Sequence, residues 1–175
     1  MKIRDHAGFT LIELLIVVAI IGIIAAIAVP GLLRARMAGN EASAIGSLRS
    51  IASAQHTYSS SCGGGGYATT LDDLALPPTA GGPAFIPADL AAAAPGGTPK
   101  SGYEYVIGGA GAVVLSSAAT CNSASADTMT GFFVNADPTD PGVTGTRFFA
   151  TDQSGQMRQD YTASLVDLTS GTPIQ

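Results

Sequence analysis

Sixteen consecutive residues without a polar side chain, Leu14 to Val29, are the strongest constraint on how this chain folds. Counted from Phe9 to Leu33, the apolar segment is long enough as a helix to cross a hydrocarbon core of roughly 30 Å. One carboxylate, Glu13, lies inside it, and the next charged residue is Arg34. A carboxylate in a membrane segment costs roughly 2 to 3 kcal/mol, so it is by default functional and has a partner. The sequence therefore predicts a membrane-spanning helix over residues 9–33.

The residues before this segment form a short basic leader, 1–8, that ends at Gly8. Together with the sequence Gly8-Phe9-Thr10-Leu11-Ile12-Glu13, this layout resembles the amino-terminal signature of the type IV pilin superfamily, which includes type IV pilins and the pseudopilins of type II secretion. The resemblance implies that a prepilin peptidase cuts between Gly8 and Phe9 and methylates the new amino terminus on Phe9. It also implies that Glu13 acts in assembly, by neutralising the Phe9 amine of a neighbouring subunit. The alternative for Glu13 is stabilisation by the start of its own helix.

Two residues that weaken helices, Gly22 and Pro30, lie inside the apolar segment. Proline cannot donate a hydrogen bond to the carbonyl of Ala26, and its ring crowds that turn, so the helix should kink or loosen between Gly22 and Pro30. The resemblance continues through these residues and covers roughly the first third of the chain. It implies that this stretch melts in assembled fibres and makes them extensible.

Residues 34–60 have the periodicity of an amphipathic helix. The apolar set is Met37, Ile45, Leu48, Ile51 and Tyr58, and the polar set is Asn40, Ser43, Ser47, Ser50 and Thr57. Three serines ending at Ser61 and the glycines of 63–66 then stop the helix. We expect one long helix whose second half is soluble and packs under a globular head formed by residues 61–175.

The head has the sequence pattern of a small antiparallel sheet preceded by a loop region. Thr70 is placed to cap a single helical turn, the segment 77–99 is rich in Pro, Gly and Ala, and 88–94 is a candidate short helix. Strands are predicted at 103–107, 112–116, 131–135, 146–151 and 156–158, with hairpin turns at Gly108-Gly109 and 152–155. The predicted fold class is α+β, with a long amino-terminal helix packed against this sheet, which is the pilin fold that the resemblance implies.

Charge is unevenly distributed between helix and head. Residues 61–175 contain three cationic side chains and ten carboxylates, a balance of −7. A negatively charged head repels the phosphate backbone of nucleic acids, so direct nucleic-acid binding is not expected.

The two cysteines, Cys62 and Cys121, both lie in the head. In an oxidising compartment an even pair favours one disulfide, whose loop would stabilise the head by roughly 4 kcal/mol in the chain-entropy model. The alternative is two buried free thiols. Many type IV pilins close a disulfide loop with two cysteines near the carboxyl terminus. Here Cys62 lies at the end of the predicted helix, so that loop is not expected in this chain.

Catalytic and metal-binding patterns are weak, and no enzyme activity and no cofactor are predicted. His56, the only histidine beyond the leader, is interpreted as a helix-surface residue, and one histidine with two cysteines does not suit a zinc site. Asp137, Asp140 and Asp152 are close enough in sequence to be weighed as calcium ligands. The alternative is that the two Asp-Pro pairs among them simply form turns.

The sequence thus favours a structural filament subunit held in the inner membrane as a single-pass precursor. The resemblance implies as partners further copies of the chain, minor pilins, the prepilin peptidase and an inner-membrane assembly platform. Two alternatives stay open. A pseudopilin would form a short periplasmic fibre in type II secretion instead of an extracellular pilus. A secreted binding domain would use an ordinary signal peptide cleaved near Ala26-Ile27-Ala28.

Overall fold

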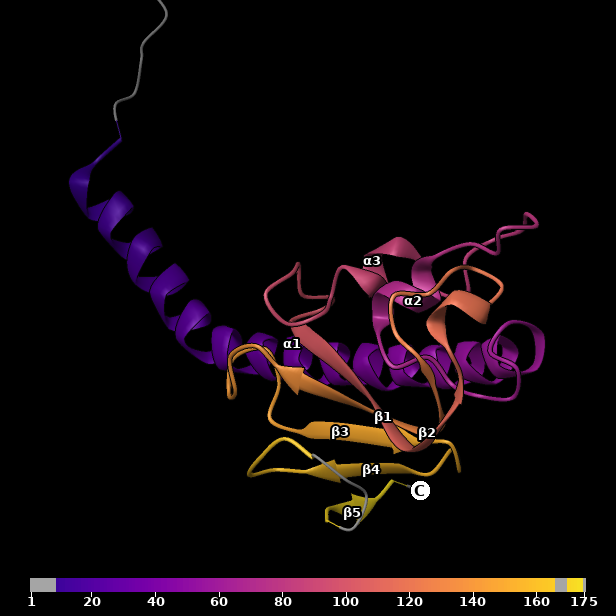
Figure 1. Ribbon diagram of the computed structural model, residues 1–175. Coiled ribbons are helices and arrows are strands. Elements are labelled where there is room, and N and C mark those ends of the chain that lie inside the picture. The colour runs from indigo at the N-terminus through magenta and orange to yellow at the C-terminus, as the bar shows by residue number, and fades with distance from the viewer. Residues whose placement is uncertain (1–8, 166–169, 175) are drawn as a thin grey trace, which may run out of the picture. The chain divides into compact units, whose positions relative to one another are not determined.

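The structure is a computed structural model that describes residues 9–165 and 170–174 (Figure 1). The leader predicted at 1–8, including Gly8 at the expected cleavage site, lies outside the described residues. Contacts divide the chain into two compact units, Met1–Arg36 and Met37–Gln175. The long helix α1, Leu11–Ser61, supplies the described helical part of the first unit and the first element of the second. Its limits agree with the predicted helix to within about two residues.

The second half of α1 is amphipathic, as predicted, but its buried face differs in detail. Leu48, Ile51 and Tyr58 are fully buried, whereas Ile45 is only half-buried. Ser47, which the periodicity placed on the polar side, is buried, and so is Glu41. A helical face drifts by about 20° for every seven residues, so a face assigned from a short window misplaces residues at its margins.

Two short helices follow α1. Thr70 caps α2, Leu71–Ala75, by accepting a hydrogen bond at its hydroxyl from the Asp73 backbone N–H, 3.1 Å away, as its residue type predicts. The second, α3, spans Ala88–Ala91 inside the segment 88–94 where a short helix was expected. The chain leaves α3 beside the sheet, where the Ala93 carbonyl accepts a hydrogen bond from the Tyr105 N–H at 2.8 Å.

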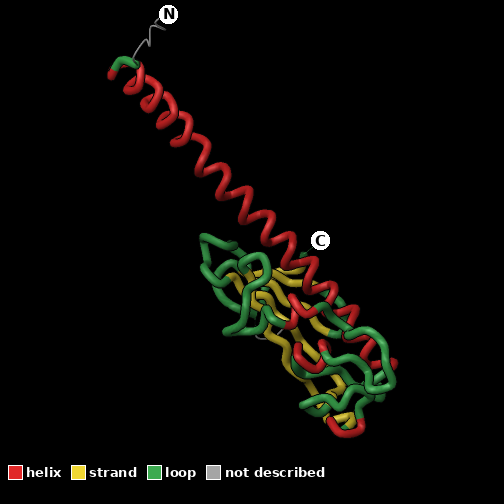
Figure 2. The backbone as a smooth tube through the Cα atoms, turned by 90° about the horizontal axis from the view of Figure 1, so that it is seen from above, coloured by secondary structure: helices red, strands yellow, loops and turns green. Residues whose placement is uncertain are grey.

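One antiparallel sheet, with its strands in chain order, forms the rest of the second unit (Figures 1 and 2). A single turn of 3-10 helix, η1, Ser117–Ala119, lies between the first two strands. The strands are β1 Tyr103–Leu115, β2 Thr128–Pro138, β3 Phe148–Asp152, β4 Met157–Asp160 and β5 Thr172–Pro173. The predicted α+β fold, a long helix packed against a small antiparallel sheet, is therefore confirmed, with the predicted turn at 152–155 joining β3 to β4.

The hairpin turn predicted at Gly108-Gly109 is wrong. Both glycines lie inside β1, where they pair in register with Phe133 and Phe132 of β2. These glycines allow neighbouring side chains to approach the backbone of β1 closely. A Cβ added at Gly108 would lie 2.5 Å from the Phe133 ring, and one at Gly109 would lie 2.5 Å from a side-chain carbon of Thr69. Adjacent glycines indicate a turn only where neighbouring atoms leave room for a side chain. The chain reverses direction after Leu115 instead.

Alanine at Gly108 is expected to destabilise the protein by about 1 to 3 kcal/mol, because the new methyl group overlaps the Phe133 ring. Gly46→Ala is the matched control. It adds the same methyl on the exposed face of α1, with nothing within 4 Å, and should stabilise by roughly 0.5 to 1 kcal/mol. Urea unfolding of the detergent-solubilised protein, followed by tyrosine fluorescence, measures both. Equal midpoints for the two variants would contradict the packing role.

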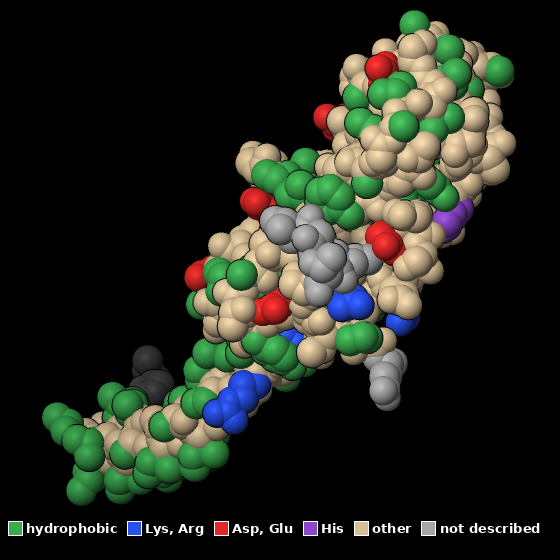
Figure 3. Space-filling view, turned by 60° about the horizontal axis from the view of Figure 1, so that its bottom comes forward, with side chains coloured by type: hydrophobic (Ala, Val, Ile, Leu, Met, Phe, Trp, Pro, Cys, Tyr) green, Lys and Arg blue, Asp and Glu red, His purple; other side chains and the backbone are tan. Residues whose placement is uncertain are grey.

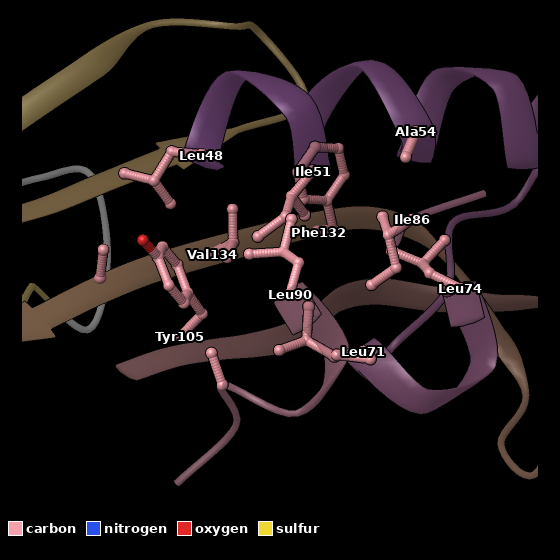
Figure 4. Packing of buried hydrophobic residues seen from close by; sticks show 14 of the residues in the cluster. Leu48, Ile51, Ala54, Leu71, Leu74, Ile86, Leu90, Tyr105, Phe132 and Val134 are labelled. Carbon is pink, nitrogen blue, oxygen red and sulfur yellow. The ribbon is translucent and has the colours of Figure 1, made fainter. Parts of the chain in front are cut away.

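The hydrophobic core lies between the second half of α1, the sheet and the two short helices. In Figure 4, Leu48 and Ile51 of α1 lie close to Phe132 and Val134 of β2. Leu71 and Leu74 of α2, Leu90 of α3 and Ile86 close the other side of the cluster. Because α1 contributes to this cluster only from Ala44 onward, the second unit contains its own core.

A disulfide joins Cys62, directly after α1, to Cys121, in the connection between β1 and β2. The two Cα atoms are 4.7 Å apart, and the bond closes a sequence separation of 59 residues. Thr79 strengthens this junction, since its N–H and its hydroxyl both donate to the Cys121 carbonyl at 2.8 Å. The pairing favoured by the sequence is present, and it ties the end of α1 to the sheet.

Reducing this disulfide is expected to lower the free energy of unfolding by about 2 to 4 kcal/mol, because the open chain gains loop entropy when it unfolds. The measurement compares urea midpoints with and without dithiothreitol. The double variant Cys62→Ser/Cys121→Ser is the control: it should start at the lower midpoint and ignore the reductant. A wild-type midpoint that does not change after thiol titration has confirmed reduction would contradict this prediction.

Candidate functional site

The first half of α1 exposes an almost entirely apolar surface. Within the described residues, α1 is the one helix long and apolar enough to cross a membrane, and its most apolar window has no residue buried within the chain. Leu11 is 81% exposed and Ile27 is 77% exposed. Figure 3 shows this surface in green, with Lys and Arg side chains in blue beyond it. A helix that is apolar on every side requires lipid or other helices around it.

Glu13 closes a capping box at the start of α1. Its carboxylate oxygen Oε2 accepts hydrogen bonds from the Thr10 N–H at 2.9 Å and from the Thr10 hydroxyl at 2.6 Å. The Glu13 N–H in turn donates to Thr10 Oγ1 at 3.3 Å. Such a box satisfies backbone donors that the first turn would leave unpaired. Sequence reasoning singled out Glu13 and missed Thr10, although the Thr-x-x-Glu spacing is the signal for this motif.

The other carboxylate oxygen of Glu13, Oε1, has no hydrogen-bond partner among the described residues. The helix cap thus uses one oxygen and leaves the second available to a cation. Glu13 can therefore cap its own helix and also contact the amine of another copy, although these two roles were treated above as alternatives.

Gly22 and Pro30 lie within α1, whose helical assignment is continuous from Leu11 to Ser61. Neither residue ends the helix. A kink or loosening at this stretch therefore stays a prediction, and the missing N–H of Pro30 is the local weakness that motivates it.

A buried ion pair fastens α1 to the connection between β2 and β3. Glu41, 6% exposed, accepts hydrogen bonds from the Thr146 N–H and hydroxyl, both at 2.9 Å, through its oxygen Oε1. Its Oε2 binds Arg147 through Nε at 2.8 Å and through the second guanidinium nitrogen at 2.7 Å. Arg147 also donates to Gln159 Oε1 of β4 at 2.8 Å and lies 5.2 Å from the centre of the Phe149 ring. Four donors therefore meet the carboxylate, two on each oxygen, and the two from Arg147 are charge-assisted.

Burial alone would raise the pKa of Glu41, but the hydrogen bonds from Thr146 and Arg147 and the charge of Arg147 outweigh it and hold that pKa below its usual value. Sequence reasoning missed this pair. The available signal was a single carboxylate on the face of the amphipathic helix that carries Leu48 and Ile51. Its partner, Arg147, is 106 residues away in sequence, and no local pattern connects the two.

The three aspartates weighed as calcium ligands are not brought together. In the register of β2 and β3, Asp152 lies opposite Phe133, four residues along β2 from Asp137, which corresponds to about 13 Å. Asp140 is exposed, in the turn that follows β2. Among the residues that the structure describes, no group of three or more His, Cys, Asp or Glu side chains could hold a metal ion.

Asp137 instead belongs to a small polar cluster at the end of β2. One of its oxygens accepts from Ser164 at 2.7 Å and from Asn135 at 3.0 Å. Burial raises the pKa of Asp137, and these two hydrogen bonds only partly oppose the effect. The cluster joins β2 to the segment after β4.

His56 lies on the exposed side of α1, as the sequence suggested, where its ring meets those of Tyr67 and Phe132 edge-on at 5.8 and 6.4 Å between centroids. These are packing contacts, and no hydroxyl or carboxylate is hydrogen-bonded to the imidazole within the described residues. His56 thus lacks the partners that a catalytic histidine uses.

Comparison with known proteins finds matches to part of the chain. Residues 3–29 match the family described as the prokaryotic N-terminal methylation motif. A segment of 55 residues is 47% identical to the type IV wide pilus major component PilA4 of Thermus thermophilus, covering 31% of this chain and 42% of the relative. A segment of 53 residues is 45% identical to the type IV major pilin protein PilA of Myxococcus xanthus, covering 30% of this chain and 24% of the relative.

The matched segments thus span less than half of each relative's own length. No solved structure gives a significant match. By their names both relatives are components of pili, which is a structural role and not an enzymatic one. The chain therefore carries a prepilin-type methylation motif at residues 3–29 and is similar to type IV pilus components over part of its length.

Proposed function

We propose that the chain is the structural subunit of a type IV pilus-like filament, stored in the inner membrane as a single-pass prepilin and polymerised through the first half of α1. The observation that carries the proposal is the exposed apolar surface of residues 11–33. In the membrane this surface contacts lipid. In a filament the same surface packs against the helices of other copies, and the second unit, with its own core, faces outward.

In this proposal the leader 1–8 is removed between Gly8 and Phe9, and the new amino terminus is methylated on Phe9. The matched methylation motif supports this processing. Glu13 then lies about 6 Å, one helical turn, along the helix from the new amine. Its free oxygen, Oε1, neutralises the Phe9 amine of a neighbouring copy, which sets the register of the entering subunit. Gly22 and Pro30 allow the helix to loosen in the filament.

Mass spectrometry of the mature amino terminus, from membranes and from sheared surface fibres, tests the proposal. An N-methylated Phe9 peptide in both fractions is the expected result. A terminus near Val29 on a protein that is soluble outside the cell would instead support the secreted binding domain with an ordinary signal peptide. The proposal would then be wrong, because that cleavage removes the segment through which the subunits are proposed to polymerise.

The choice between a pilus and a secretion pseudopilus requires a second experiment. Both named relatives are pilus components, so the pilus is the proposed assembly, and the filament is expected on the cell surface. Deleting the gene should abolish surface fibres and leave the level of secreted enzymes unchanged. Loss of enzyme secretion with intact surface fibres would assign the chain to a pseudopilus.

A further inference from the structure

A cleft of about 670 Å³ lies within the second unit, between the last three turns of α1 and the loop 78–85. It is called the hydroxyl cleft below. Its helix wall is a row of hydroxyl side chains above an apolar floor, and none of the described residues that line it carries a charge. The wall consists of Ser50, Ser53, Thr57 and Ser61, and the floor includes Ala54 and Phe85. Such a lining suits an uncharged group that is mostly apolar and has a polar end.

The loop that forms the opposite wall is fixed at both ends. At its start, the N–H and the hydroxyl of Thr79 both donate to the Cys121 carbonyl at 2.8 Å. At its end, the Phe85 N–H donates to the Leu74 carbonyl at 2.9 Å. The first two serine hydroxyls of the helix wall make no hydrogen bond to any described residue. The hydroxyl cleft is therefore preformed and has hydroxyls free to bind a polar group.

Tyr161, in the segment after β4, is the most exposed large hydrophobic side chain among the described residues of the second unit, at 63%, and the only aromatic one in this exposed set. It is the middle residue of a turn in which the Asp160 carboxylate accepts from the Thr162 N–H at 2.7 Å and from the Thr162 hydroxyl at 2.6 Å. These bonds hold the residues on both sides of the tyrosine. A ring presented by an ordered turn loses little conformational entropy on binding.

The ring and the hydroxyl cleft lie near opposite ends of the second unit. Tyr161 directly follows β4, whose residue Gln159 accepts a hydrogen bond from Arg147. Arg147 in turn binds Glu41, near the start of the part of α1 that belongs to this unit. From Glu41 to Thr57 in the cleft wall is about 24 Å along α1. Tyr161 therefore lies far from the cleft of its own chain.

We propose that Tyr161 of one copy inserts into the hydroxyl cleft of the next copy in the filament. The inference rests on the proposed function, because it describes how the second units of assembled copies meet. The ring contacts Phe85 and the apolar floor, and the phenolic hydroxyl binds the serine hydroxyls of the helix wall. Tyrosine suits a site that is apolar at one end and polar at the other.

Charge and symmetry favour a second copy of the chain as the occupant. Residues 61–175 have a charge balance of −7, so two such units repel each other and are expected to touch through uncharged surfaces. A contact between two different surfaces near opposite ends of a unit is heterologous, and repeating it produces an open filament. Packing through the first half of α1 keeps neighbouring copies together, so this second contact forms at a high effective concentration.

Photo-cross-linking of filaments with p-benzoylphenylalanine in place of Tyr161 tests the inference. The expected product has the mass of a dimer, and fragmentation mass spectrometry should place the link within residues 50–61 or 78–85. The same reagent at Val143 is the matched control. Val143 is 60% exposed and precedes Thr144, whose carbonyl accepts from Asn40 near the same end of the unit. It should give no link to the hydroxyl cleft, and filaments dissociated in detergent should give no dimer from position 161.

Substitutions on both sides of the contact give an independent readout. Tyr161→Ala is expected to lower filament yield by at least about tenfold, as the loss of a buried aromatic anchor does. Tyr161→Phe keeps the ring and should lower it by only about two- to threefold. Ser53→Trp fills the cleft and should match Tyr161→Ala, whereas Ser60→Trp, on an exposed residue of α1 outside the cleft lining, should form normal filaments. Equal urea midpoints would show that the substitutions leave the fold intact.

Two results would overturn the inference while leaving the proposed function intact. One is a set of wild-type-like filaments in which position 161 gives no link to the hydroxyl cleft of another copy, or links only to a different protein. The other is a normal filament yield from both Tyr161→Ala and Ser53→Trp. Absence of filaments from the wild type would instead contradict the proposed function itself.

Discussion

Glu13→Ala is expected to abolish filaments completely while leaving a processed subunit in the membrane. The substitution removes both carboxylate oxygens, including Oε1, which makes no hydrogen bond to a described residue and is proposed to meet the amine of a neighbouring copy. Without it, an entering subunit would bury an unpaired amine among apolar helices, a cost of several kcal/mol. Electron microscopy of sheared fibres and immunoblotting of membranes measure the two effects.

Thr10→Val is the matched control, because it separates the capping box from the contact with the neighbouring amine. Valine has nearly the shape of threonine and removes the hydroxyl that donates to Glu13 Oε2, but it leaves the carboxylate in place. We expect this variant to lose about 1 kcal/mol of helix stability and to keep its filaments. If both variants lost filaments to the same extent, the cap alone would account for the role of Glu13. Normal filaments from Glu13→Ala would exclude the proposed contact.

The long helix and the fold class could be predicted because their signals are local. Sixteen apolar residues in a row, an amphipathic period and a serine- and glycine-rich stop determine α1 without reference to the rest of the chain. The cap of α2 at Thr70 is local in the same way. Each of these elements depends on residues within a few positions of itself, so periodicity and capping rules suffice.

The errors have the opposite origin. The pair Gly108-Gly109 was predicted to be a turn, because nothing near it in sequence shows that the Phe133 ring lies against Gly108 and the Thr69 side chain against Gly109. Asp137 and Asp152, which were weighed as calcium ligands beside the turn-forming alternative, are close in sequence but are separated by the register of β2 and β3. In both cases the position of the residues depends on the pairing of strands that are far apart in sequence. No short sequence pattern indicates that pairing.

Arg147→Met is expected to destabilise the second unit by about 3 to 5 kcal/mol, the largest effect on stability among these predictions. Methionine keeps much of the apolar stem against Phe149 but removes the guanidinium from Glu41. The Glu41 side chain is 7% exposed, so its carboxylate would remain buried and uncompensated. Glu41→Gln should cost less, because the Arg147 side chain is 27% exposed and keeps both water and Gln159 as partners.

The double variant Glu41→Leu/Arg147→Met tests whether burial of an unpaired charge causes this loss. With both charges replaced by apolar groups, stability should recover to within about 1 kcal/mol of wild type. Urea midpoints of wild type, Glu41→Leu, Arg147→Met and the double variant form a double-mutant cycle. Additive losses in the double variant would show that the two side chains act independently, which would contradict the buried pair.

Acid should remove the contribution of this pair. Because the pKa of Glu41 is lower in the folded protein than its usual value of about 4.3, the folded state binds fewer protons than the unfolded chain between these two pKa values. The stabilisation is therefore fully present above about pH 5 and is lost as the pH falls through the folded pKa.

Asp137, whose pKa is raised, acts in the opposite direction, so the pH dependence of the wild-type unfolding free energy contains contributions from both groups. The difference in unfolding free energy between wild type and Glu41→Gln isolates the pair. It should be constant from pH 6 to 8 and shrink at lower pH, and a difference that persists unchanged to pH 2 would show that packing at position 41 is responsible instead of its charge.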